Sequence, residues 1–252
     1  MPDELRGKIE RTLATISIDD GGGCSVHKAY VMAWLIRHYR LKPTLDIGVY
    51  RGRSFFPQAI AHRDHTHSAV YGVDPWSATE AAEDDNPALR EAIQAFVATT
   101  DFDDIYRQVV HTADTLKLSA NIRIVRKPST QAAEQFQADQ TTFGLIHIDG
   151  NHDAAPVMRD VELYLPLLQP GGFLVMDDVS WDSVRPAEDY VAARCRLVLR
   201  RITPDKLDDF AIYRKGGSGL ETALLARRLR RLGEDTFLRR RVRGLLWRLG
   251  VR

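Results

Sequence analysis

Short apolar runs alternate with segments long enough to form helices between about residues 44 and 215. Most of these runs are β-branched or aliphatic and nearly continuous in apolar character, which is typical of parallel strands buried on both faces of a sheet. This alternation predicts βαβ units and therefore a doubly wound α/β sheet. The expected parallel strands are Thr44–Gly48, Val70–Asp74, Asn121–Val125, Phe143–Asp149 and Gly172–Asp177.

The pattern changes near residue 196, where two strand-like runs follow one another without a helix between them. Arg196–Ile202 and Phe210–Lys215 are joined by the turn TPDKLDD, so we expect an antiparallel hairpin at the edge of the sheet. Helices are expected at His27–Tyr39 and Ala154–Leu168, before the first and fifth strands. The predicted fold class is α/β, with a mostly parallel, seven-stranded, Rossmann-like sheet and a core over residues 25–215.

Length and composition indicate one domain followed by a tail. The chain has 252 residues, which suits a single α/β domain at 1–218 and leaves a basic tail at 219–252. The charged N-terminus lacks the apolar stretch of a secretory signal, and no apolar run approaches the ~18 residues of a membrane span. Only two cysteines are present, so we expect a cytoplasmic protein. A net charge of +1 argues against nucleic-acid binding.

The segment TLDIGVYRGRS places two glycines directly after the first expected strand. Gly48 and Gly52 permit a tight turn and a close approach of the backbone to a ligand, and the next helix can direct its amide end at a negative group. The pattern DxGxxxGxS lacks the middle glycine of GxGxxG, which weakens a pyrophosphate-binding interpretation. Asp74, at the end of the second strand, can bind ribose hydroxyls or cap the turn. The loop predicts a nucleotide-type ligand, with a structural turn as the alternative.

Three aspartates stand at the ends of two expected strands. Asp149 ends the fourth strand, and Asp177 and Asp178 end the fifth. Ligands of open α/β sheets bind outside the carboxyl ends of strands, and neighbouring strands are ~4.8 Å apart, so these carboxylates can converge. Carboxylates that close repel one another unless a cation neutralises them. Oxygen ligands favour Mg²⁺, or else Mn²⁺ or Ca²⁺, over zinc.

His152 follows Asp149 by three residues, in the turn after the fourth strand. A histidine there can reach a substrate hydroxyl held on the metal. Its ordinary pKa of ~6.5 suits a general base near neutral pH. The alternative is a turn histidine bonded to the backbone.

Four segments, LDIGVYRGRS, VYGVDPW, IHIDGNHD and LVMDDV, resemble in this order the metal-dependent O-methyltransferases, and most closely the branch that modifies sugars and natural products. The resemblance covers about residues 25–215. It implies a class I methyltransferase fold, S-adenosylmethionine as the methyl donor and a divalent metal ion.

The resemblance also implies roles for single residues. Asp149, Asp177 and Asp178 stand at the metal-ligand positions of catechol O-methyltransferase-like enzymes. His152 stands where the sugar-modifying branch has a histidine thought to act as base and the catechol enzymes have a lysine. The implied cofactor contacts are Asp46, Gly48 and Ser54 with the methionine moiety, Asp74 with the ribose and Ser129 with the adenine.

The expected function is therefore methyl transfer from S-adenosylmethionine to a hydroxyl of a sugar or glycoside, with Asp149 and His152 as catalytic residues. A catechol or another phenol is the alternative acceptor. An NAD-dependent oxidoreductase shares the strand–glycine–acid layout, but leaves the aspartates without a role. A non-catalytic binding module with the same fold does not need them either.

Two segments lie outside this core pattern. Residues 76–119 exceed a normal connection, and we expect a helical insertion that is either a lid over the site or an added surface helix pair. The tail at 219–252 has ten arginines against three acidic residues. We expect it to dock on a second subunit or on its own core; a membrane-surface helix and a solvated tail are the alternatives. Its leucines at helical spacing are Leu224, Leu225, Leu229 and Leu232.

Overall fold

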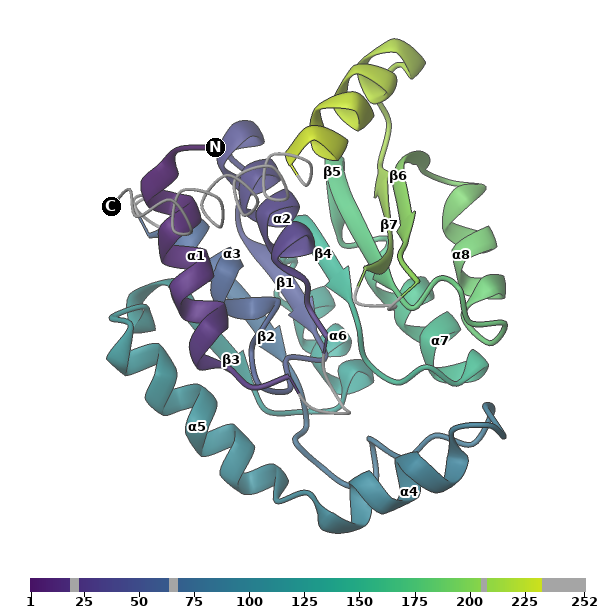
Figure 1. The fold of residues 1–252 in the computed structure, drawn as a ribbon. Helices are drawn as coiled ribbons and strands as arrows, with labels where there is room; N and C mark the ends of the chain where they lie inside the picture. The colour runs from purple at the N-terminus through teal and green to yellow at the C-terminus, as the bar shows by residue number, and fades with distance from the viewer. Residues whose placement is uncertain (19–22, 64–67, 205–207, 233–252) are drawn as a thin grey trace, which may run out of the picture.

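A computed structural model, which describes residues 1–18, 23–63, 68–204 and 208–232, shows an α/β fold built on a seven-stranded sheet (Figure 1). The strand order is β3-β2-β1-β4-β5-β7-β6. The first five strands pair in parallel, and β7 pairs antiparallel with both β5 and β6. The predicted fold class, including the C-terminal hairpin, is confirmed. The strands are β1 (Thr44–Ile47), β2 (Val70–Val73), β3 (Ile122–Val125), β4 (Phe143–Ile148), β5 (Leu168–Asp177), β6 (Arg196–Ile202) and β7 (Asp209–Arg214).

The apolar runs form strands because the centre of the sheet is covered on both faces. Every residue of β1 and β4 is buried. One boundary differs from the prediction: β5 begins at Leu168 rather than at Gly172, because Leu168 pairs with Phe143 before the register shifts. The preceding helix accordingly ends at Tyr164, and not at Leu168 as predicted.

Helices cover each face of the sheet over a separate hydrophobic layer (Figure 1). In the first layer, α2 is buried over most of its length, and every residue from His27 to Ile36 is buried. A lysine near the start of this helix is therefore held inside the protein. The first layer contains α1 (Asp3–Thr15), α2 (Val26–Tyr39) and α3 (Phe55–His62), and the second contains α6 (Ser129–Ala138), α7 (Ala154–Tyr164) and α8 (Arg185–Ala192).

The predicted insertion between β2 and β3 is helical. It contains α4 (Arg90–Thr99) and α5 (Phe102–Thr115), followed by the short 3-10 helix η1 (Ser119–Asn121). Helix α5 buries one apolar face in the first layer, whereas α4 has no buried residue. The insertion is thus anchored by its second helix.

The first part of the tail, residues 219–232, is a helix that packs on the first layer. Leu224, which shares the helical spacing, is 61% exposed and does not belong to the packed face. The described part of the tail therefore docks on its own core. Residues 233–252 lie outside the described residues, so docking on a second subunit, a membrane-surface helix, a solvated tail and the division at residue 218 all stay predictions. No helix among the described residues has the length and apolar character to span a membrane. The buried leucines of the tail are Leu225, Leu229 and Leu232.

Candidate functional site

The predicted site residues gather at the carboxyl ends of the central strands, where β1, β2, β4 and β5 end. Strand β1 lies between β2 and β4, and the strand order changes direction there. Ligands of open α/β sheets bind outside the strand ends at such a switch point. The topology therefore brings residues from four strands to one potential ligand site.

The glycine loop after β1 lies directly against the end of β4. Gly48 has a φ of +82°, and an added Cβ would lie 1.8 Å from the carbonyl oxygen of Asp149. Gly52 has a φ of +86°, and an added Cβ would lie 2.5 Å from the ring of Phe56. Glycine alone tolerates both the left-handed backbone and these contacts. The predicted tight turn is present and fixes the loop against Asp149.

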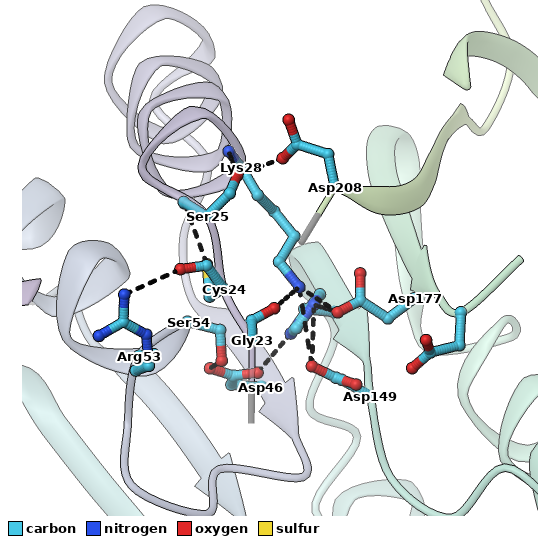
Figure 2. Close-up of polar contacts among 12 residues, drawn as sticks. Gly23, Cys24, Ser25, Lys28, Asp46, Arg53, Ser54, Asp149, Asp177 and Asp208 are labelled. Carbon is cyan, nitrogen blue, oxygen red and sulfur yellow. Dashed lines mark hydrogen bonds and ion pairs between the residues drawn. The ribbon is translucent and has the colours of Figure 1, made fainter. Parts of the chain in front are cut away.

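Asp46 of β1 is completely buried and bonded to two side chains. Its carboxylate accepts a hydrogen bond from Ser54 Oγ at 2.8 Å (Figure 2). It accepts a second one from His147 Nδ1 at 2.6 Å. Burial lowers the pKa of His147, but the negative charges of Asp46 and Asp177 outweigh it and raise this pKa to about 10. Asp46 and Ser54 thus belong to a buried network, and their contact with a methionine moiety stays a prediction.

Asp74 connects the glycine loop to the start of the insertion. Its carboxylate accepts hydrogen bonds from the backbone amides of Tyr50 at 2.8 Å and Trp76 at 2.6 Å. Burial raises the pKa of Asp74 to about 6, although these hydrogen bonds act in the opposite direction. A carboxylate has about four lone-pair sites, so Asp74 keeps the capacity to accept bonds from a ribose. That role stays a prediction.

Ser129, the predicted adenine contact, starts α6 and faces α7. Its hydroxyl donates a hydrogen bond to Asp160 Oδ1 at 2.5 Å, and its carbonyl accepts one from the Tyr164 hydroxyl at 2.6 Å. The hydroxyl and the carbonyl of Ser129 therefore both bond to α7, and the adenine contact stays a prediction.

Lys28 of α2 lies among the aspartates at the ends of β4 and β5 (Figure 2). Its ammonium forms an ion pair with Asp177 and lies 3.8 Å from Asp149 Oδ2. The side chains of Lys28 and Asp177 are only 2% and 7% exposed. Burial lowers the pKa of Lys28, but the charge of Asp177 outweighs it, so the pKa lies well above its usual value. Burial likewise raises the pKa of Asp177, but Lys28 and His147 bring it below the usual value. Both groups are charged.

His152 lies between two aspartates and the insertion. Its Nε2 is 2.8 Å from Asp178 Oδ2, without the alignment of a hydrogen bond, and 3.6 Å from Asp149 Oδ1. Its Nδ1 lies 2.7 Å from Glu83 Oε1. Burial lowers the pKa of His152, but the charge of Asp178 and the contacts with Asp149 and Glu83 raise it well above 6.5. The expectation of an ordinary pKa was wrong, because three carboxylates surround the ring.

Among the described residues, two groups offer ligand atoms that lie within 4.8 Å of one another: His147, Asp149 and Asp177; and Asp149, His152 and Asp178. The predicted metal ligands are thus divided, with Asp149 in both groups. The first group does not fit a divalent ion in this arrangement, because the ammonium of Lys28 already lies beside Asp149 and Asp177. The second group is partly exposed, and its two carboxylates suit a hard cation.

The acidic start of the insertion docks on the turn that carries His152. The backbone amides of Asp84 and Asp85 donate hydrogen bonds to the Asp153 carboxylate at 2.8–3.1 Å. Glu83, the preceding residue, accepts a hydrogen bond from the backbone amide of His152 at 3.0 Å, and its carboxylate also contacts the His152 ring. The insertion therefore covers His152, while its opening and closing as a lid stay a prediction.

Sequence reasoning missed three members of the site, namely Lys28, His147 and Glu83. His147 carried a usable signal, because it is a polar residue within an otherwise apolar strand. Glu83 is one of several acids in TEAAEDDN, and its partner His152 is 69 positions away. Lys28 and Asp177 are 149 positions apart. No spacing rule joins residues that the fold alone brings together.

Comparisons of sequence point to one family. A family model described as a methyltransferase domain matches residues 45–179, a span that contains the glycine loop and all three aspartates. A curated relative, the uncharacterized protein y4gI of Sinorhizobium fredii (strain NBRC 101917 / NGR234), is 26% identical over 148 residues. The match covers 58% of this chain and only 14% of the relative.

Solved structures share the fold at low identity. The O-methyltransferase from Bacillus cereus in complex with SAH has a TM-score of 0.59 and 15% identity, over 86% of this chain and 92% of that one. TomG from Streptomyces achromogenes, an O-methyltransferase involved in tomaymycin synthesis and solved in complex with SAM, has a TM-score of 0.58 and 14% identity over the same shares. At these identities the likeness shows a common fold.

Proposed function

Because the chain belongs to the family of methyltransferase domains, we propose that it transfers a methyl group from S-adenosylmethionine to a hydroxyl oxygen of a small molecule. The acceptor that we propose is a sugar or glycoside. One observation carries the proposal: His152 meets Asp149 and Asp178 at the strand ends beside the glycine loop. A proton acceptor and concentrated negative charge thus lie next to the proposed cofactor site.

In this proposal the cofactor lies across the ends of β1 and β2. Its ribose bonds to Asp74, its methionine moiety lies near Gly48, Gly52 and Ser54, and its adenine lies toward Ser129. Its sulfonium carries a positive charge, so the carboxylate of Asp149 favours its approach to the acidic side chains. The glycines matter because a side chain at either position would collide with the protein itself.

The reaction requires alignment more than covalent help from the protein. The acceptor oxygen attacks the methyl carbon in line with the sulfur, the carbon–sulfur bond breaks, and the thioether product leaves. Orientation of the two reactants supplies ~7–11 kcal/mol in well-aligned systems. His152 accepts the hydroxyl proton at Nε2, while Glu83 at Nδ1 fixes the orientation of the ring.

We place the divalent ion that the sequence predicts only at the partly exposed group of Asp149, His152 and Asp178. Asp149 and Asp178 would hold it, with His152 beside it as the base, and acceptor oxygens or water would complete its ligands. When bound, it supplies Lewis-acid polarisation of the acceptor hydroxyl.

The acceptor class rests on the sequence resemblance and on one further contact. The ring of Trp181 lies 5.1 Å from the ring of His152, so an aromatic face borders the site. Such a face suits a ring-shaped acceptor. A phenol such as a catechol is the second candidate, because its hydroxyl demands less of the base.

A product assay tests the proposal. The protein is incubated with S-adenosylmethionine that carries a deuterated methyl group and with panels of glycosides and phenols, and products are identified by mass spectrometry. We expect a glycoside to gain the labelled methyl, and His152→Ala to lower the rate by about 10²–10⁴-fold. His111→Ala, an exposed position on α5, serves as the control. Full activity of His152→Ala, or cofactor binding without transfer to any hydroxyl, would overturn the proposal.

A further inference from the structure

Lys28 is the one lysine whose ammonium, among the described residues, lies at the ends of β4 and β5. Besides Asp177 and Asp149, its ammonium donates a hydrogen bond to the carbonyl of Gly23 at 3.3 Å (Figure 2). All of these acceptors are negative or carry partial negative charge. The ammonium thus fills the position between two predicted metal ligands.

The start of α2 holds Lys28 in place. Ser25 caps this helix, and its hydroxyl oxygen accepts a hydrogen bond from the backbone amide of Lys28 at 2.9 Å. The same hydroxyl donates a hydrogen bond to Asp208, which precedes β7 (Figure 2). The helix end is therefore attached to the C-terminal hairpin, and the lysine extends from a fixed backbone into the site.

The charge balance of the buried side depends on this lysine. Asp177 has one carboxylate oxygen on the ammonium, and its other oxygen, Oδ1, makes no hydrogen bond among the described residues. A buried carboxylate without a counter-ion is strongly unfavourable, and so is a buried ammonium. A divalent ion at the same position would lie next to the ammonium, which adds repulsion to the loss of that pair.

We propose that Lys28 is the resident cation on the buried side of the site, and that Asp177 is its counter-ion rather than a metal ligand. A divalent ion then has only the exposed side, at Asp149 and Asp178. The inference concerns the site of the proposed function, but it does not require that the protein methylate any particular acceptor.

The proposal is tested by Mn²⁺ binding and by unfolding, so its failure is distinguishable from a failure of methyl transfer. The variants are Lys28→Met, Asp177→Asn, and the two combined. Lys8→Met is the control, because Lys8 forms an ion pair with Glu4 one turn away on α1. Electron paramagnetic resonance measures bound Mn²⁺, and urea and thermal unfolding measure stability with and without the ion.

We expect Asp177→Asn to have the same Mn²⁺ affinity as the wild type. If the wild type binds no Mn²⁺, the variant should bind none either. Lys28→Met should be destabilised without metal, because Asp177 loses its nearest counter-ion and keeps only the ring of His147, whose Nε2 is 3.7 Å from Asp177 Oδ2. Mn²⁺ about 100-fold above its Kd should raise the unfolding temperature of Lys28→Met by about 5 °C or more beyond its effect on the wild type, and this additional gain should vanish in the double variant.

Two results would overturn the proposal: a loss of tenfold or more in Mn²⁺ affinity on Asp177→Asn, or a folded Lys28→Met protein that Mn²⁺ stabilises no more than it stabilises the wild type. If Lys28→Met does not fold, Lys28→Arg takes its place beside Asp177→Asn. Because arginine keeps the positive charge, the Lys28→Arg variant should retain most of the stability and should gain no Mn²⁺ binding; a gain would contradict the proposed role of the charge.

Discussion

At the scale of single residues, the proton on His152 determines whether this side chain can act as a base. Burial disfavours the charged ring, but Asp178, Asp149 and Glu83 favour it and raise the pKa well above its usual value. Only the neutral ring accepts a proton. Methyl transfer should therefore increase with pH, and a positive sulfonium or metal ion near Asp149 should lower the pKa of His152 towards neutrality.

Replacement of Glu83 by Gln removes one negative neighbour of His152 and so lowers the pKa of the ring. The rising limb of kcat/KM against pH should move to lower pH, while the plateau kcat falls about 10-fold because Nδ1 loses its charged partner. Glu91→Gln, at the exposed start of α4, is the matched control. An unshifted limb together with a full kcat would show that Glu83 does not act through His152.

Asp74 gives a separate pH dependence to cofactor binding. Burial raises its pKa to about 6, so the carboxyl group is protonated below that pH and ionised above it. Because the ionised form accepts bonds from ribose hydroxyls, affinity for S-adenosylmethionine should rise as the pH passes through about 6. Isothermal titration calorimetry between pH 5 and 8 measures this rise. Asp74→Asn should bind more weakly at pH 7.5 and should lose the step; a step of the same size in both proteins would contradict the assignment.

The residues that were predictable are those that follow strands. Asp149, Asp177 and Asp178 stand where the apolar runs stop, so a sequence pattern places them at the edge of the sheet. Their partners were not predictable, because Lys28 belongs to a helix and Glu83 to the insertion. The pKa of His152 depends on those partners, which is why its ordinary value failed as an expectation.

At the scale of elements, the glycine loop and the strand that carries Asp149 form one unit. Gly48→Ala combines a left-handed backbone with a collision against the Asp149 carbonyl, and should cost about 3 kcal/mol or more in the free energy of unfolding. Gly171→Ala is the control, since Gly171 has a φ of +78° but nothing within 4 Å of an added Cβ. It should cost only about 1 kcal/mol in urea unfolding. Equal costs would mean that the contact with β4 has no effect.

The attachment of α2 to the C-terminal hairpin should weaken at acid pH. Burial of Asp208 raises its pKa, but the nearby ring of His27 and hydrogen bonds from Ser25 and Arg201 outweigh burial and lower this pKa to about 2. A lowered pKa means that the stabilisation is complete above about pH 4 and disappears as the pH falls towards 2. Asp208→Asn should therefore lose about 2 kcal/mol at pH 7 and much less at pH 2.5.

Urea unfolding of Asp208→Asn and the wild type at the two pH values measures this difference. Asp189→Asn, at an exposed position on α8, controls for a general effect of removing a charge. A deficit for Asp208→Asn that is the same at pH 7 and pH 2.5 would contradict the role of the ionised carboxylate.

The sequence pattern predicts the strands, but it does not predict where α7 ends and β5 begins. The strands were predictable because a parallel strand that is buried on both faces has a nearly continuous apolar sequence. The end of α7 at Tyr164 was not, because Leu165, Leu167 and Leu168 continue the apolar pattern of the helix while they already belong to the turn and to β5. Only the pairing of Leu168 with Phe143 decides between the two structures.

At the scale of the whole molecule, one sheet edge unites three parts of the chain. The strands supply the aspartates, the insertion supplies Glu83, and α2 supplies Lys28. The alternation of strands and helices was sufficient to predict the sheet and its edge, because parallel crossovers follow few topologies. It was not sufficient to show that the insertion and α2 contact the carboxyl ends of the strands, since those contacts depend on packing over the entire chain.

The central claim is that a methyl donor binds beside His152 and Asp149, and a crystal structure of the protein with S-adenosylhomocysteine tests it most directly. The account predicts ribose hydroxyls on Asp74 and a sulfur within about 8 Å of His152 Nε2, a separation that admits the methyl group, an acceptor oxygen and its proton. A cofactor bound elsewhere, or a sulfur directed away from the ends of β4 and β5, would contradict it.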